Sequence, residues 1–190
     1  VSLEANLFTT QIEPHDSYCK VFDNMRRINC ILLDFSQDMW RYISDDWLKL
    51  KVVEGEVGSS TMPHKVNPID FENAEGNLGV SNSLLSFFSY KLPISRLQRD
   101  LSDSTVLRNI GVSFAYSLVA YSSISKGLSK IDINKEKMLL DLQSHPEVLS
   151  EALQTILRRV GAKGAYEAIK DIARGKEVNF EKLEQFLNGC

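Results

Sequence analysis

The sequence predicts an all-α protein in which long helices form a bundle and a smaller helical unit follows. Three observations support this fold class. Apolar residues recur every three or four positions over stretches of more than twenty residues, which is the period of one helix face. Proline precedes and glycine follows several of the shorter stretches, as at helix ends. No alternating polar and apolar stretch of any length competes with these assignments.

The first long helix is expected from Asp16 to about Lys49, with Asp16 as its N-terminal cap. Such a length is typical of helices that pack as rods in a bundle. Its apolar positions at helical spacing are Tyr18, Phe22, Met25, Ile28, Leu32, Phe35, Met39, Tyr42 and Ile43. Cys19 and Cys30 lie on this helix too far apart for a disulfide, so we expect two small buried thiols.

The second helix is expected from Pro68 to about Tyr90, because proline is favoured in the first turn and Pro93 stops the pattern. Its buried stripe would consist of Phe71, Leu78, Leu84, Leu85 and Phe88. A third long helix is expected from about Ser104 to Lys130, capped by Ser102 or Asp103.

Shorter amphipathic stretches follow, at 134–142, 146–160, 163–173 and 179–187. The change in length predicts a domain boundary near residue 132. Residues 1–131 would belong to the long-helix bundle, with an irregular loop at 55–68, and residues 132–190 would form a small helical domain.

Composition restricts the possible partners. The chain has 22 basic and 25 acidic residues and a net charge of -3, so it lacks the basic surplus expected of a nucleic-acid-binding protein. No window of 18 uninterrupted apolar residues and no secretory signal pattern occur, which predicts a cytoplasmic protein without a membrane role. Its three cysteines have no metal-ligand spacing, so no metal is expected.

The loop expected at 55–68 is rich in groups that bind anions. It contains Gly58-Ser59-Ser60-Thr61-Met62-Pro63-His64-Lys65-Val66-Asn67 and ends at Pro68. Glycines allow backbone amides to converge, and a lysine among such donors can stabilise the charge left when a proton leaves a carbon beside a carboxylate. A serine held there can act as the base. The same composition also fits a flexible surface connector, and a lone His64 is ordinarily solvated or structural.

The order of these residues resembles the signature loop of the fumarase/aspartase superfamily, whose members release fumarate from substituted succinates. The resemblance implies that Ser59 abstracts the proton and that Lys65 and Asn67 bind the carboxylate that becomes doubly charged. Ser60 and Met62 would be substrate-binding neighbours in the loop.

A second cluster of cations surrounds the expected start of the third helix, where free backbone amides favour an anion. Ser104 and Arg108 are four residues apart and share a helix face, and Arg99 precedes them. A hydroxyl and two guanidinium groups suit a phosphate. The alternative is ordinary ion pairing with Asp100 and Asp103 on a solvated helix end.

The stretch Lys91-Leu-Pro-Ile-Ser-Arg-Leu-Gln-Arg-Asp-Leu-Ser-Asp-Ser-Thr-Val-Leu-Arg-Asn109 is similar to the nucleotide-phosphate segment of the adenylosuccinate lyase family. Thr9 to Asp16 and Ile69 to Asn73 fit its bacterial branch, and the resemblance extends from about residue 7 to the end. It implies that Gln11 contacts the succinyl group and that Glu72 and Asn73 help to form the carboxylate pocket. It also makes Arg99, Ser104 and Arg108 the phosphate ligands.

The resemblance implies β-elimination of fumarate from adenylosuccinate to give AMP, and from the succinylated imidazole carboxamide ribotide of purine synthesis. It implies no cofactor and a homotetramer with shared active sites. The family's acid histidine lies in an N-terminal half that this sequence does not contain, so the chain alone is expected to be inactive. Two alternatives remain: a lyase similar to argininosuccinate lyase, and a catalytically silent helical oligomerisation module.

Overall fold

The computed structural model describes residues 4–51 and 67–162, together with residues 164, 166, 167, 169, 170, 184 and 185. The chain divides into two compact units, Val1–Ile133 and Asn134–Cys190, which are described separately below. Helices make up most of the described residues in each unit, and the only strands among them are three residues long. The all-α fold class is therefore confirmed.

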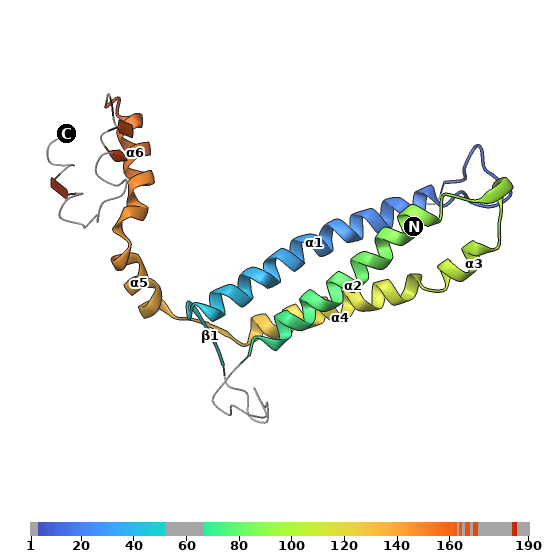
Figure 1. Cartoon of the computed structure of the whole chain (residues 1–190), viewed down its shortest axis with the longest axis horizontal. Helices are drawn as coiled ribbons and strands as arrows, with labels where there is room; N and C mark the ends of the chain where they lie inside the picture. Colours follow the sequence, from blue (N-terminus) through green and yellow to red (C-terminus); the bar gives the residue numbers. More distant parts are fainter. Residues whose placement is uncertain are drawn as a thin grey trace. The chain divides into compact units, whose positions relative to one another are not determined.

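The first unit is a bundle of three long helices, α1 (Asp16–Ser44), α2 (Ile69–Lys91) and α4 (Ile110–Ser129). Figure 1 shows them running side by side, with α2 antiparallel to both of its neighbours. At one end of the bundle, β1 (Leu48–Leu50) pairs antiparallel with β2 (Ile131–Ile133). At the other end, a short 3₁₀ helix η1 (Arg96–Gln98) and α3 (Ser102–Leu107) connect α2 to α4.

The first predicted helix was too long at its C-terminal end. Helix α1 stops at Ser44 rather than Lys49, and Asp46 takes a left-handed conformation with φ of 61°. The chain then turns and continues as β1, a strand that was not predicted because three residues give no readable alternation. Asp16 begins the helix but makes no side-chain cap, and His15 occupies the cap position.

The third predicted helix is broken in two at Arg108 and Asn109. The Asn109 side-chain amide donates to the Thr105 carbonyl at 3.0 Å, and its backbone amide bonds to Val106 instead. A helix is weakened where a side chain donates to a backbone carbonyl that would otherwise accept a helical N–H, and this favours such a break. The cap also differs from the prediction, since Leu101 precedes α3 and both Ser102 and Asp103 lie inside it.

Helix α2 supplies more buried apolar residues to the core of this unit than any other described helix. Phe71, Leu78, Leu85 and Phe88 of its predicted stripe are each at most 1% exposed, while Leu84 is only partly buried. On α1 fewer residues of the predicted apolar stripe are buried than expected. Phe22 and Met39 are buried, but several other stripe residues are not. More than a third of the side chain is exposed at Tyr18, Ile28 and Tyr42.

The prediction of two buried thiols is wrong for Cys30, which is exposed, whereas Cys19 is half-buried. Burial raises the pKa of the Cys19 thiol, and the nearby carboxylates Asp23 and Asp16 raise it further.

A layer of polar side chains lies in the middle of the bundle. Asn29 of α1 is fully buried, and its side-chain amide donates to Ser117 at 2.9 Å and to Ser81 at 3.3 Å. Tyr121 donates its hydroxyl to the Asn29 carbonyl oxygen. Burial raises the pKa of the Tyr121 phenol. Because every heavy polar atom named here has a partner, the layer ties the three helices together without an unpaired donor.

Gly127 lets α4 approach the start of α2 closely, which makes it a test of the packing at that end. A Cβ at this position would lie 2.9 Å from Cζ of Phe71 and 3.2 Å from Cβ of Asp70. We expect Gly127→Ala to lower the free energy of unfolding by about 1–3 kcal/mol, measured by urea titration. Gly79→Ala is the control, because nothing lies within 4 Å of its added methyl. Equal stability of both variants would contradict the close approach.

The second unit contains α5 (Lys135–Ser144), a 3₁₀ helix η2 (Pro146–Val148) and α6 (Leu149–Arg159). Asn134 caps α5 by accepting from the Lys137 amide, and Gly161, with φ of 82°, follows α6. The helices expected at 163–173 and 179–187 lie mostly outside the described residues. Within the ranges that the structure describes, no helix is long and apolar enough to span a bilayer.

Candidate active site

The predicted site residues fall into three sets. Ser59, Ser60, Met62 and Lys65 lie outside the described residues. Asn67 and Asn73 lie at the end of the bundle that carries β1 and β2, whereas the four remaining residues lie at the opposite end (Figure 1). Those four are Gln11, Arg99, Ser104 and Arg108.

The end with the strands holds both flanks of the segment 52–66. Lys51 and Asn67, which flank it, line one small cavity together with Lys130 at the end of α4. The cavity has a volume of about 20 Å³, enough for one water molecule. A cavity of this size does not hold a nucleotide.

Asn73 faces α4 from the first turns of α2. Its side-chain amide donates to Ser123 at 2.8 Å, and its carbonyl oxygen accepts from Asn77 at 2.7 Å. An asparagine offers two N–H donors and two acceptor lone pairs, so these bonds leave one of each for a ligand. The neighbouring Glu72 accepts from the indole of Trp40 at 2.9 Å, which connects it to α1.

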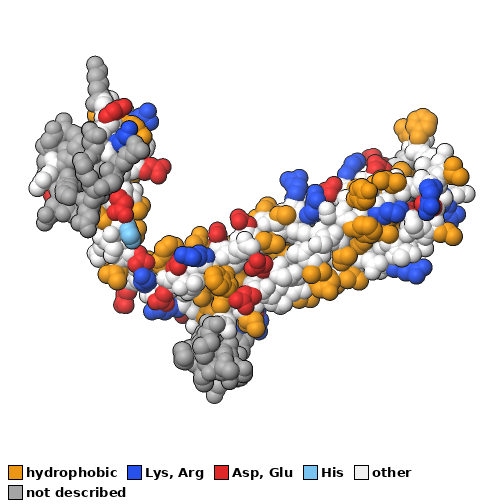
Figure 2. Space-filling model, in the orientation of Figure 1, with side chains coloured by type: hydrophobic (Ala, Val, Ile, Leu, Met, Phe, Trp, Pro, Cys, Tyr) orange, Lys and Arg blue, Asp and Glu red, His pale blue; other side chains and the backbone are white. Residues whose placement is uncertain are grey.

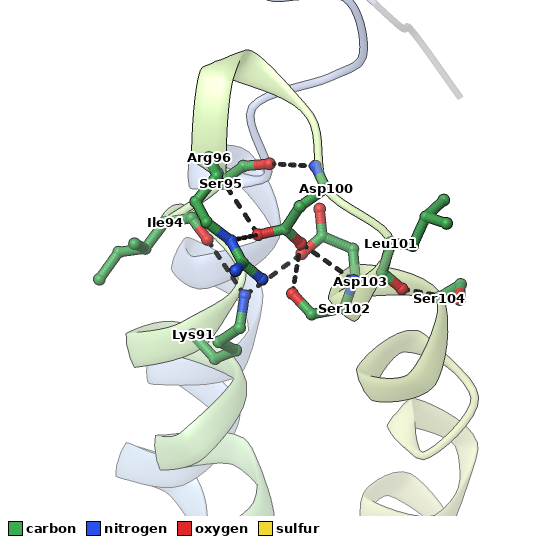
Figure 3. A network of polar contacts seen from close by, with 9 residues as sticks. All are labelled: Lys91, Ile94, Ser95, Arg96, Asp100, Leu101, Ser102, Asp103 and Ser104. Atoms are coloured by element: carbon green, nitrogen blue, oxygen red, sulfur yellow. Dashed lines mark hydrogen bonds and ion pairs between the residues drawn. The ribbon is translucent and has the colours of Figure 1, made fainter.

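A polar network at the opposite end connects α2, η1 and α3 (Figure 3). Asp100 accepts hydrogen bonds from Ser102 and from the amide and guanidinium of Arg96, and its ion pair with Arg96 measures 3.2 Å. These donors, the Ser102 hydroxyl first, hold the pKa of Asp100 far below its usual value. Asp103 is 4% exposed and pairs with Lys91 at 3.5 Å.

Both acids that were candidates to neutralise Arg99 and Arg108 are therefore bound to other cations. Across the described part of the chain, the side chains of Arg99 and Arg108 form no ion pair or hydrogen bond, and both are exposed. The alternative of ordinary pairing with Asp100 and Asp103 is wrong for these two arginines. Two uncompensated guanidinium groups at one end of the bundle form a local positive field that suits an anion.

Ser104 and Gln11 complete the set at this end. The Ser104 hydroxyl is exposed and donates to the Leu101 carbonyl at 3.0 Å, so its oxygen lone pairs remain for a donor. Gln11 is exposed and precedes α1, whose first turn lies beside the last turn of α2, as shown by the contact of Cys19 with the Ser89 carbonyl at 3.5 Å.

The turn before Arg99 has an unusual backbone. Leu97 and Gln98 both have left-handed conformations, with φ of 51° and 68°. For residues other than glycine this conformation costs about 1–2 kcal/mol each. Ser95 and Asp100 hold the turn closed, since the Asp100 amide donates to the Ser95 hydroxyl at 2.9 Å. The polar network thus fixes the backbone position from which the Arg99 side chain extends.

Helix α2 separates the two groups of site residues. It has 23 residues and is about 34 Å long. No side chain spans that length, so Asn67 and Arg108 of one chain cannot contact the same small substrate. This separation was not foreseen from the sequence, because both groups flank α2 in the chain and only its straight helical form places them apart.

Sequence reasoning also missed the ion pairs that support each end. Lys91 and Asp103 are twelve residues apart, and Lys130 pairs with Asp70 across sixty residues at 2.7 Å. The spacing of apolar residues along the chain does not indicate which charged residues pair across such separations. In the described ranges no cluster of three metal-ligating side chains occurs. A larger cavity of about 350 Å³ in the second unit, between α5 and η2, is lined by apolar residues, Gln143 and His145 and has no lysine or arginine for a phosphate.

Comparison with known proteins gives the same family along the whole chain. The family model described as "Adenylosuccinate lyase C-terminal" matches residues 95–190, and one described as "Lyase" matches residues 2–80. An adenylosuccinate lyase of Legionella pneumophila (strain Corby) is 57% identical over 187 residues, which cover 98% of this chain and 41% of the relative.

Two further relatives agree. The adenylosuccinate lyase of Escherichia coli (strain K12) is 52% identical over 189 residues, covering 100% of this chain and 41% of that protein. The adenylosuccinate lyase of Dictyostelium discoideum is 53% identical over 190 residues, covering 98% of this chain and 41% of that protein. The chain thus spans about 41% of the length of the curated relatives that it matches. On this evidence the chain belongs to the adenylosuccinate lyase family.

Proposed function

We propose that this chain supplies part of the active sites of an adenylosuccinate lyase, which cleaves adenylosuccinate to AMP and fumarate. The same site would release fumarate from the succinylated imidazole carboxamide ribotide. The observation that carries the proposal is the pair of exposed arginines, Arg99 and Arg108, whose neighbouring acids are already bound to Arg96 and Lys91. Unpaired guanidinium groups are suited to a phosphate ester, which fumarate-releasing reactions on non-nucleotide substrates do not require.

In the proposed reaction, Ser59 removes the proton from the carbon beside the succinyl carboxylate. Lys65 and Asn67 stabilise the resulting negative charge, and Ser60 and Met62 contact the substrate in the same segment. The carbon–nitrogen bond then breaks, and the departing nitrogen takes a proton from an acid outside this chain. Gln11 and Asn73 bind the succinyl part, while Arg99, Ser104 and Arg108 bind the phosphate.

Each active site would combine residues from more than one copy of the chain. The 34 Å length of α2 supports this, because it keeps Asn67 and Arg108 of one chain apart. The bundle also exposes large apolar side chains on all three long helices, and Figure 2 shows them gathered in patches on one face. Examples are Val21, Ile31, Phe87, Tyr90 and Leu118. A homotetramer formed through such surfaces would bring the two groups together.

A chimeric lyase allows the function to be tested. In it, this chain replaces the matching 41% of the Escherichia coli relative, to which it is 52% identical. We expect the chimera to release fumarate from adenylosuccinate, followed by ultraviolet absorbance. A folded tetrameric chimera without this activity would contradict the proposed function.

Arg108→Ala in the chimera is expected to weaken substrate binding by about 1.5–3 kcal/mol, a rise in KM of roughly 10- to 100-fold, because a charged hydrogen bond to phosphate is lost. Arg41→Ala is the matched control, since Arg41 is 67% exposed and pairs only with Asp45 on the surface. An unchanged KM in the Arg108 variant would favour a substrate without a phosphate.

Mixing two impaired variants, assayed at substrate concentrations well below the KM of the Arg108 variant, tests the shared site directly. Lys65→Ala and Arg108→Ala would each damage every site in their own homotetramer. When they are denatured and refolded together, some sites receive Lys65 from one chain and Arg108 from another, so we expect activity to return. Recovery no greater than the sum of the two separate variants would place both residues in one chain's site and contradict the proposal.

A further inference from the structure

The structure points to Lys130 as a positioning residue for the proposed reaction, and we propose that it fixes Asn67 by joining the two flanks of the segment 52–66. The inference rests on the proposed function. Lys130 lies at the end of the bundle where β1, β2 and the start of α2 meet.

The backbone of Lys130 holds the first flank. Its carbonyl accepts the Lys51 amide at 2.7 Å, directly beside the pairing of Leu50 with Ile131 in the two-stranded sheet. The Lys51 ammonium also lies 3.2 Å from the Asp132 carboxylate. The residue before the segment is thereby attached to the end of α4 by its main chain and to β2 by its side chain.

The side chain of Lys130 holds the second flank. Its ammonium is 2.7 Å from the Asp70 carboxylate, and Asp70 lies in the first turn of α2, three residues after Asn67. The two side chains are 11% and 13% exposed, so the pair is weakly screened by solvent. Both charges also suit the helix ends on which they lie, a cation at the C-terminus of α4 and an anion at the N-terminus of α2.

The flanks are packed with little free space. Asn67 and Lys130 line the same cavity of about 20 Å³, and Gly127 allows the ring of Phe71 to approach α4 at that point. A shift of the start of α2, which closely follows Asn67 in the chain, would therefore displace Asn67. For a group that stabilises transition-state charge, a displacement of about 1 Å can lower the rate on the order of 10²-fold.

Lys126 provides a matched control within the same cluster. It also reaches Asp70, at 3.6 Å, but its side chain is 57% exposed. Unlike Lys130, it does not carry the carbonyl that receives the Lys51 amide. If only the charge near Asp70 mattered, both lysines would be equivalent. If the joining of the flanks matters, Lys130 alone is required.

The test uses Lys130→Met, Lys130→Arg and Lys126→Met in the chimeric lyase. We expect Lys130→Met to lower kcat by about 10²-fold with KM changed less than about threefold, since Asn67 is misplaced while the phosphate ligands are untouched. Lys130→Arg retains the cation and should recover kcat to within about tenfold of the parent, and Lys126→Met should stay within about threefold.

Folding and function are checked separately. Each variant is compared with the parent by circular dichroism and by light scattering, so that a loss of structure is distinguished from misplacement. Lys130→Met with parental kcat, or an equal loss in Lys126→Met, would overturn the inference. Failure of the proposed function would appear differently, as a parent chimera that is folded but releases no fumarate.

Discussion

Ser59→Ala in the chimeric lyase is expected to lower kcat by about 10²- to 10⁴-fold, the contribution of a positioned general base. Serine is a weak acid, so its alkoxide depends on nearby donors, and each unit by which its pKa falls needs about 1.4 kcal/mol of differential stabilisation. Alanine cannot accept the proton at all. Because substrate binding depends on other groups, KM should change little, and steady-state kinetics with adenylosuccinate measure both constants.

Ser83→Ala is the control for this substitution. Ser83 is exposed on α2, and its hydroxyl donates only to the Gly79 carbonyl at 3.0 Å. Its loss should leave turnover unchanged. Parental kcat in the Ser59 variant would remove the serine from the proposed chemistry and would return the segment 55–68 to the alternative of a surface connector.

Phe88→Ala is expected to cost about 3–5 kcal/mol of unfolding free energy in the 190-residue chain. Phe88 is 1% exposed and lies at the centre of the core cluster formed with Phe22, Leu85, Leu92 and Val106. Its ring centroid is 5.5 Å from that of Phe22. Truncation removes contacts to α1 and leaves a cavity that a close-packed core cannot collapse fully. Urea denaturation followed by circular dichroism gives the value.

The adjacent Phe87 is a matched control. It has the same side chain on the same helix but is 47% exposed. Under dilute conditions where the chain is monomeric, Phe87→Ala should change stability by less than about 1 kcal/mol. Equal losses at both positions would contradict the assignment of Phe88 to the core.

The predictions from sequence were most accurate where burial is periodic. Helix α2 was expected from Pro68 to about Tyr90 and spans Ile69–Lys91, because apolar residues on its buried side pack into core clusters near both of its ends. The predictions were least accurate where individual hydrogen bonds determine the point at which a helix begins, ends or breaks. The break at Asn109, the turn at Asp46 and the capping of α1 depend on individual side chains or on backbone conformation, and hydrophobic spacing does not record these.

The proposed site shows the same division. The candidate residues in the segment 55–68 and around Arg108 could be proposed from the sequence because their order resembles that of a known family, whereas their composition alone also fits a surface connector. The sequence did not indicate which acidic residue pairs with which basic residue. Asp100 and Asp103 are closer in sequence to Arg99 and Arg108 than Asp103 is to Lys91, yet the fold pairs them with Arg96 and Lys91.

By itself, the sequence determined the helical class and the apolar stripe of α2, and it supplied two sets of candidate anion-binding residues. Those features follow from local periodicity and residue chemistry, which are written along the chain. Only the tertiary structure decided that the described residues Asn67 and Arg108 lie at opposite ends of the bundle and that Lys130 contacts residues on both sides of the segment 52–66. Distances between residues far apart in sequence arise from how rigid helices pack, and no local pattern encodes them.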